Sequence, residues 1–160
     1  MKKILLALLL LVAAPVASLA EPAAAVGAKE RCPVCGMFVA KYPNWITQVR
    51  LADGTVRYFD GMKDLLAYSF QPAQFGGKPD AIREIWAKDY YTLAWLDART
   101  AYFVVGSDVY GPMGLEFIPF ASEKAAQAFA KDHHGKQVLP FKAITEALVE
   151  SLRAGQQMRH

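Results

Sequence analysis

The 160-residue chain has only two cysteines, and both lie in one short motif, RCPVCGMFVAKYP, at residues 31–43. The single disulfide that they allow, Cys32–Cys35, would close a tight loop and constrain little of the unfolded chain, so it would be a poor structural staple. Only three histidines and no second paired cysteine motif are present, which leaves a zinc knuckle two ligands short. Three interpretations of the motif therefore remain: a redox pair, a site for another metal, or a zinc site that lacks two ligands.

Long hydrophobic runs are absent after residue 20, so nothing there is long enough to cross a membrane. Residues 1–20 combine two early lysines, an apolar run at 4–12 and small residues at 17–20, a pattern typical of a secretory signal peptide cleaved after Ala20. A membrane anchor is the alternative, but the run is short and Pro15 interrupts it. No cysteine directly follows the small residues, so we expect no lipid attachment and a location in the periplasm.

A strong excess of one charge is also lacking. Removal of Lys2 and Lys3 with the signal peptide lowers the formal net charge from +3 to +1. No basic stripe interleaved with aromatic residues occurs, which argues against nucleic-acid binding. The sequence shows no nucleophile elbow, phosphate loop or convincing acid–base pair, so we expect a protein that is not an enzyme.

The hydrophobic periodicity indicates an α+β fold built from two similar ββαβ units and a C-terminal helix. An Asp-Gly turn joins two alternating strands, and Asp60 and Ser122 stand where the caps of two helices are expected. The expected elements are strands at 45–51, 56–59 and 81–90, a helix at 61–70, two strands within 92–106, a strand at 117–120, a helix at 123–134, a strand at 136–141 and a helix at 142–152.

These elements divide the chain into four parts. Residues 1–20 form the signal peptide, and residues 21–31, rich in Ala, Pro and Gly, form a flexible tether. Residues 32–91 make the first ββαβ unit, which carries the C-x-x-C-G-M motif. Residues 92–160 make the second unit, with a G-P-M-G loop and the C-terminal helix.

Methionine distinguishes the metal alternatives. Met37 follows Cys35 by two residues, and Met113 lies between a proline and a glycine in YGPMG, at an expected loop apex. A thiolate together with thioethers is a soft donor set, which selects Cu(I) over zinc, calcium or magnesium. The competing interpretation is that both methionines are ordinary apolar filler, their commonest role. The residues alone leave these two interpretations level.

The segments CPVCGMFVAKYP, YFDGMKDLLAY and AKDYYTLAWLDARTAYFVVGSDVYGPMGLEFIPF closely resemble the NosL family of copper-binding accessory proteins. The resemblance runs from about residue 32 to 141 and implies a fold similar to that of organomercurial lyase. It also implies a periplasmic Cu(I) metallochaperone that helps to load nitrous oxide reductase in denitrification, with an ABC-type transporter complex as partner. Cys35, Met37 and Met113 match the family's metal residues, and Cys32 is added to them.

Two rival functions remain. The first is a periplasmic thiol–disulfide oxidoreductase that uses Cys32 and Cys35, although its motif would normally open a helix. The second is an organomercurial-lyase-like enzyme, which needs a proton donor beside the cysteines that the sequence does not reveal. His133 and His134 stand at an expected helix end, where histidines are more often solvated cations. Either histidine is also a candidate for a third or fourth copper ligand.

Overall fold

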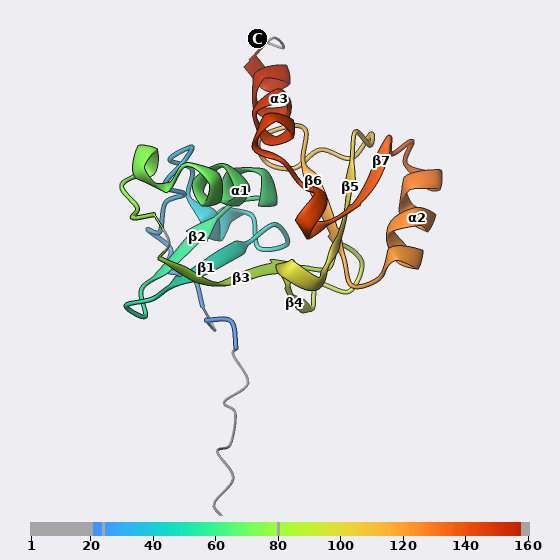
Figure 1. Cartoon of the computed structure of the whole chain (residues 1–160). Coiled ribbons are helices and arrows are strands. Elements are labelled where there is room, and N and C mark those ends of the chain that lie inside the picture. The colour runs from blue at the N-terminus through green and yellow to red at the C-terminus, as the bar shows by residue number, and fades with distance from the viewer. Residues whose placement is uncertain (1–20, 24, 80, 158–160) are drawn as a thin grey trace, which may run out of the picture.

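Two antiparallel sheets and three α-helices make up the described part of the chain, residues 21–23, 25–79 and 81–157, in a computed structural model (Figure 1). This architecture confirms the predicted α+β class. The expected signal peptide, residues 1–20, lies outside the described residues. Within those residues, no helix has the length and apolar character needed to span a membrane.

The first sheet has the strand order β2-β1-β3-β4 and is antiparallel throughout. A turn closes its first hairpin, where Gly54 has a φ of +85° and Asp53 Oδ1 accepts a hydrogen bond of 2.9 Å from Thr55 N. Helix α1 connects β2 to β3 and ends before Pro72, as expected from the sequence. The elements are β1 Thr47–Leu51, β2 Val56–Phe59, α1 Met62–Phe70, β3 Ile82–Lys88 and β4 Trp95–Asp97.

The second sheet repeats the order of the first three strands, as β6-β5-β7, and helix α2 occupies the place of α1. Ser122 Oγ caps α2 by accepting a hydrogen bond of 3.2 Å from Ala125 N. The two ββαβ units are thus present. Strand β4 follows residue 91, where the first unit was predicted to end, but it pairs with β3 and so belongs to the first sheet. The elements are β5 Tyr102–Val105, β6 Phe117–Phe120, α2 Glu123–Asp132 and β7 Gln137–Pro140.

The C-terminal helix α3, Glu146–Gln157, packs against α1 and so joins the two units (Figure 1). It begins later than the pattern predicted, because Phe141–Ala143 form a 3-10 turn. Thr145 then supplies the start of the helix, since its Oγ1 accepts a hydrogen bond of 3.3 Å from Leu148 N.

One hydrophobic core extends through both units. It includes Val49 and Leu65 of the first unit together with Phe103 and Phe117 of the second, all 0% exposed. Val104, between two core residues on β5, faces a separate cluster beneath α2. Strand β5 is therefore buried on both faces and connects the two clusters.

Residues 21–31, the expected tether, contact the first sheet where the structure describes them. Arg50 Nη2 donates a hydrogen bond of 2.7 Å to the carbonyl of Glu21, and the Tyr58 hydroxyl donates one of 3.2 Å to the carbonyl of Ala25. Val26 packs against the main core. The chain thus reaches the cysteine motif along the surface of this sheet.

Candidate metal site

The cysteine motif forms a closed loop. Gly36 N donates a hydrogen bond of 2.9 Å to the Cys32 carbonyl, and Cys32 N donates one of 2.9 Å to the Met37 carbonyl. Gly36 has a φ of +77°, a conformation that favours glycine, so it lets the chain reverse directly after Cys35. Arg31 fastens the loop from outside, donating a hydrogen bond of 2.8 Å to the Gly36 carbonyl and lying 3.9 Å from the centre of the Phe38 ring.

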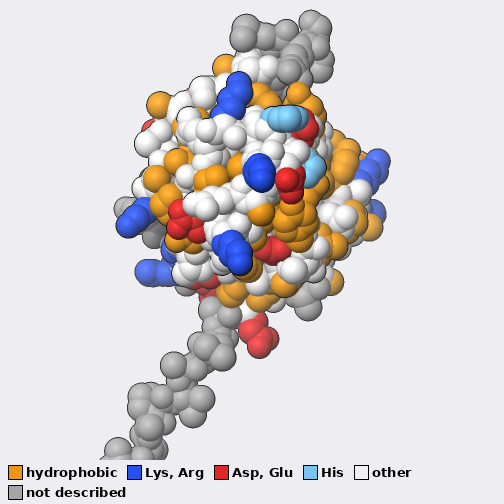
Figure 2. All heavy atoms as spheres, turned by 90° about the vertical axis from the view of Figure 1, so that its right-hand side faces the viewer, with side chains coloured by type: hydrophobic (Ala, Val, Ile, Leu, Met, Phe, Trp, Pro, Cys, Tyr) orange, Lys and Arg blue, Asp and Glu red, His pale blue; other side chains and the backbone are white. Residues whose placement is uncertain are grey.

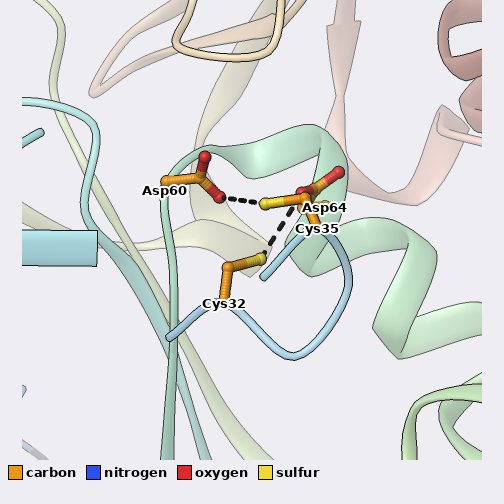
Figure 3. Close-up of side chains that lie close together, drawn as sticks. All are labelled: Cys32, Cys35, Asp60 and Asp64. Atoms are coloured by element: carbon orange, nitrogen blue, oxygen red, sulfur yellow. Dashed lines mark hydrogen bonds between the residues drawn. The ribbon is translucent and has the colours of Figure 1, made fainter. Parts of the chain in front are cut away.

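Two carboxylates lie beside the thiols (Figure 3). The Cys35 thiol donates a hydrogen bond of 3.1 Å to Asp60 Oδ1, and the Cys32 thiol donates one of 3.4 Å to Asp64 Oδ2. Asp60 follows β2, and Asp64 lies in the first turn of α1. The end of a strand and the start of a helix therefore bring both acids to the cysteine loop.

The four side chains are close enough to share one metal ion. One ligand atom from each of Cys32, Cys35, Asp60 and Asp64 lies within 4.8 Å of the others. Cys32, Asp60 and Asp64 are buried, whereas Cys35 is half-buried and offers the more accessible sulfur. Asp60 Oδ2 is buried without a hydrogen-bond partner among the described residues, so this oxygen has free acceptor capacity at the site.

The electrostatics of the metal-free site favour protons on Cys35 and Asp64. The contact with Cys32 raises the pKa of the Cys35 thiol, and burial and the charge of Asp64 act in the same direction. Burial raises the pKa of Asp64, and the nearby charge of Asp60 adds to this effect, although the hydrogen bonds from the thiols oppose it. A metal ion that binds here as a thiolate complex must therefore displace protons.

Asp60 and Asp64 were not predicted as site residues. The sequence suggested a capping role for Asp60, but the N-cap of α1 is Gly61, and the Asp60 side chain turns to Cys35 instead. The i, i+4 spacing of the two acids at the start of a helix was the signal available, because it places both on one face. Nothing in the sequence indicated which part of the chain that face would meet.

The predicted methionines lie on segments attached to this region. The Met37 carbonyl closes the cysteine loop, and the Met113 carbonyl accepts a hydrogen bond of 2.6 Å from Lys63 Nζ on α1. Both residues are half-buried. Their thioethers as copper ligands stay a prediction.

The histidines lie elsewhere. Figure 2 shows the face on the α2 side of the molecule, where the histidine side chains appear beside acidic ones. His133 Nδ1 lies 3.0 Å from Asp108 Oδ1, and its ring stacks on Phe129 at 4.3 Å between centroids. Helix α2 lies on the opposite side of the structure from α1 (Figure 1), and neither His133 nor His134 belongs to the group of four among the residues described.

Comparison with known proteins identifies copper-binding relatives of this chain. A family model named NosL matches residues 22–149. The copper-binding lipoprotein NosL of Stutzerimonas stutzeri is 34% identical over 128 residues, which cover 76% of this chain and 65% of that protein. The protein of the same name from Achromobacter cycloclastes is 31% identical over 127 residues, which cover 72% of this chain and 63% of the relative. This chain thus spans about two thirds of the length of these relatives, and both relatives are named lipoproteins.

Solved structures give the same result. The crystal structure of the copper chaperone NosL from Shewanella denitrificans superposes with a TM-score of 0.69 at 26% identity, and the match covers 81% of this chain and 99% of that one. The solution structure of apo-NosL from Achromobacter cycloclastes has a TM-score of 0.50 at 30% identity, over 64% and 87% of the two chains. The family match, the copper-binding relatives and the shared fold agree, and the chain belongs to the NosL family.

Proposed function

We propose that this protein is a periplasmic metallochaperone, not an enzyme, that carries Cu(I) for the maturation of nitrous oxide reductase. We propose further that it exchanges copper with an ABC-type transporter complex of that pathway. Membership of the NosL family supports the metal. The observation that carries the proposal is the pair of free cysteine thiols in one closed loop, with Cys32 buried and Cys35 half-buried.

This arrangement suits a carrier. Soft sulfur donors bind Cu(I) strongly, and a site with few ligands leaves room for a donor from the partner protein. The half-buried Cys35 gives an incoming ligand access to the metal, while the buried Cys32 binds the metal from the interior side. Copper then passes by exchange of one ligand at a time and does not dissociate into water.

The two carboxylates add a competing possibility for the metal. Two thiolates and two carboxylates match the number and kind of donors in a tetrahedral zinc site. Cu(I) is favoured when the metal takes the thiolates together with a thioether from Met37 or Met113, because hard oxygen donors contribute little to a soft ion. Selection for Cu(I) over zinc is thus a direct test of the ligand set.

The experiment is an anaerobic titration of the reduced protein with Cu(I) against a competing chelator, repeated with zinc. We expect about one Cu(I) per chain, tighter binding of Cu(I) than of zinc, and loss of tight binding in a Cys35→Ser variant. The loaded protein should then restore copper to copper-free nitrous oxide reductase. Binding no tighter than in a variant without cysteines would refute the proposal.

The thiol–disulfide oxidoreductase has less support. Such an enzyme requires a thiol whose pKa is lowered, usually at a helix N-terminus. Here the pKa of Cys35 is raised, and the motif leads into the 3-10 turn Val39–Lys41 instead of an α-helix. Reduction of insulin disulfides by copper-free protein would be the observation in its favour.

The lyase-like alternative gains one observation from the structure, since Asp64 is a carboxyl group beside the cysteine pair. In that reaction the two thiolates bind the mercury of an organomercurial. The proton of the Asp64 carboxyl passes to the carbon, and the electron pair of the breaking Hg–C bond remains with that carbon. Release of benzene from phenylmercuric acetate by the reduced protein is the test, and the carrier proposal predicts none.

A further inference from the structure

Helix α1, which carries the site residue Asp64, has no cap of its own. Its N-cap is Gly61, which has no side chain to accept a hydrogen bond. The carboxylate of Glu116, from the second unit, takes this role: its Oε1 accepts a hydrogen bond from Lys63 N in the first turn of α1. The same oxygen accepts one of 2.9 Å from Phe117 N. The start of α1 is thus attached to the chain just before β6.

Glu116 fits a space that glycines leave open on both sides. A Cβ at Gly61 would lie 2.2 Å from Glu116 Oε2, and a Cβ at Gly111 would lie 3.1 Å from Glu116 Cγ. Glu116 itself is only 4% exposed. The first unit and the G-P-M-G loop therefore both lie close to the Glu116 side chain. A residue larger than glycine at position 61 or 111 would require this side chain to move.

Lys63 makes a second connection between the same two segments. Its side chain is 1% exposed, and its Nζ donates a hydrogen bond of 2.6 Å to the Met113 carbonyl. Gly111 and Gly114 close the loop around Met113 with two backbone hydrogen bonds of 2.8 and 3.1 Å. The ammonium group thus holds the apex of a loop that is already closed at its base.

The positions of these two residues relative to the site are specific. Lys63 directly precedes Asp64, and Gly61, which contacts Glu116, directly follows Asp60. The segment between the two site carboxylates is therefore the segment that the second unit holds. A displacement at Glu116 would move both carboxylates relative to the cysteine loop, because the loop belongs to a different part of the chain.

We propose that Glu116 and Lys63 are positioning residues of the metal site, which fix Asp60, Asp64 and the Met113 loop relative to the cysteines. The inference rests on the proposed function, because it concerns the same site. Neither residue is a ligand in this scheme. Glu116 acts through its hydrogen bond from Lys63 N on α1, and Lys63 acts through the carbonyl of Met113.

A purely structural role would lower the stability of the fold without changing copper affinity, since removing one partner of a buried hydrogen bond is destabilising by itself. The test therefore compares Glu116→Ala and Glu116→Gln with Val104→Ala, a cavity variant in the separate cluster beneath α2. Cu(I) affinity and the rate at which iodoacetamide modifies metal-free Cys35 are measured well below each melting temperature. Peptide mapping assigns the modification to Cys35.

We expect Glu116→Ala to bind Cu(I) at least tenfold more weakly and to expose Cys35 to faster modification. Glu116→Gln keeps an acceptor oxygen for Lys63 N and Phe117 N, so it should stay within about threefold of the wild type. Val104→Ala should also stay within threefold, although its melting temperature falls. A Gln variant as impaired as the Ala variant would overturn the hydrogen-bond mechanism.

Lys63→Met supplies a second variant in case Glu116→Ala does not fold, and we expect at least a fivefold loss of Cu(I) affinity. If Lys63→Met and Glu116→Ala match Val104→Ala in both measurements, the inference is overturned. If the wild type binds Cu(I) no better than Cys35→Ser, the proposed function fails instead. In that case the inference is tested only by the rate at which iodoacetamide modifies Cys35 in the metal-free variants.

Discussion

Met113 is the side chain for which the ligand and packing interpretations differ most clearly. If its thioether binds copper, Met113→Leu should weaken Cu(I) binding tenfold or more, equivalent to about 1.4 kcal/mol. Thermal stability should change little, because such apolar swaps usually cost under about 1.5 kcal/mol. Chelator competition and thermal unfolding measure the two effects.

Met62→Leu is the matched control. Met62 is 1% exposed on α1 and belongs to the main core, so its replacement should leave copper affinity unchanged. Equal affinities in the two variants would assign Met113 to packing. The site would then be a smaller one around Cys35 and Met37.

Glu116 gives the stability of the metal-free protein a defined pH dependence. Burial raises the pKa of Glu116 from 4.5 to about 8, so the folded state holds a proton that the unfolded state has lost between these values. The resulting stability is fully present below pH 4.5 and is lost as the pH rises towards 8, by up to about 1.4 kcal/mol per pH unit. Urea unfolding of reduced protein from pH 5 to 8 measures this slope.

Glu116→Gln should flatten that slope, because glutamine does not titrate. Asp64 contributes with the same sign, since its pKa is also raised, and its charge adds to the raised pKa of Glu116. The difference between the two slopes therefore reports on Glu116 together with its coupling to Asp64. Identical slopes would mean that Glu116 is ionised throughout this range in the folded protein.

Single residues were predictable only where their chemistry is rare in the chain. Two cysteines in one motif are conspicuous, and the structure indeed places both thiols together. Aspartates are common on surfaces and at helix starts, so the contacts of Asp60 and Asp64 with the thiols needed the tertiary structure. Glu116 was missed for the same reason: its partners are Gly61 and Lys63, more than fifty positions away in the sequence.

The cysteine loop is the element most exposed to oxidation. A periplasm keeps thiols oxidised through a kinetic relay, and Cys32 and Cys35 are free in one tight loop. We expect one equivalent of Cu(I) to slow disulfide formation by a mild oxidant, because the metal occupies both sulfurs. Thiol counting over time, with and without copper, measures the protection.

The oxidised loop should not take up Cu(I) until it is reduced, because a disulfide provides no thiolate. Zinc at the same concentration serves as a comparison for the choice of metal. Equal oxidation rates with and without copper would show that the ion does not bind through the cysteines.

Most elements were predictable because their signals are local. The turn at Gly54, the end of α1 before Pro72 and the Ser122 cap all appear where the sequence indicated them. The start of α3 was predicted four residues early, because an apolar period continues through the 3-10 turn Phe141–Ala143. Periodicity does not distinguish such a turn from the first turn of a helix.

On the scale of the whole molecule, the shared core predicts a single cooperative unfolding transition. Phe103 is 0% exposed on β5 of the second unit and packs into the core that the first unit also forms. Phe103→Ala should cost about 3–5 kcal/mol. Trp86 and Trp95 lie in β3 and β4, so their fluorescence reports on the first sheet, whereas Trp45 packs against the cluster beneath α2.

Fluorescence and far-ultraviolet circular dichroism should therefore give coincident transitions in the wild type and in Phe103→Ala. Val104→Ala, in the separate cluster beneath α2, provides a comparison within the same strand. Two separated transitions would show that the units fold independently and that the common core does not couple them.

The cap that α1 takes from the second unit also limits how this site can be transplanted. When the two helices are aligned at their N-caps, Gly61 corresponds to Ser122, and Asp60 and Asp64 correspond to Ala121 and Ala125. Helix α2 thus starts with a self-contained cap and has alanines at the positions of the two site acids, whereas α1 has the acids and depends on Glu116. A designer who grafts only the C-x-x-C-G-M loop and the D-x-x-x-D turn onto another scaffold would omit that support. The smallest portable module therefore includes residues 111–117.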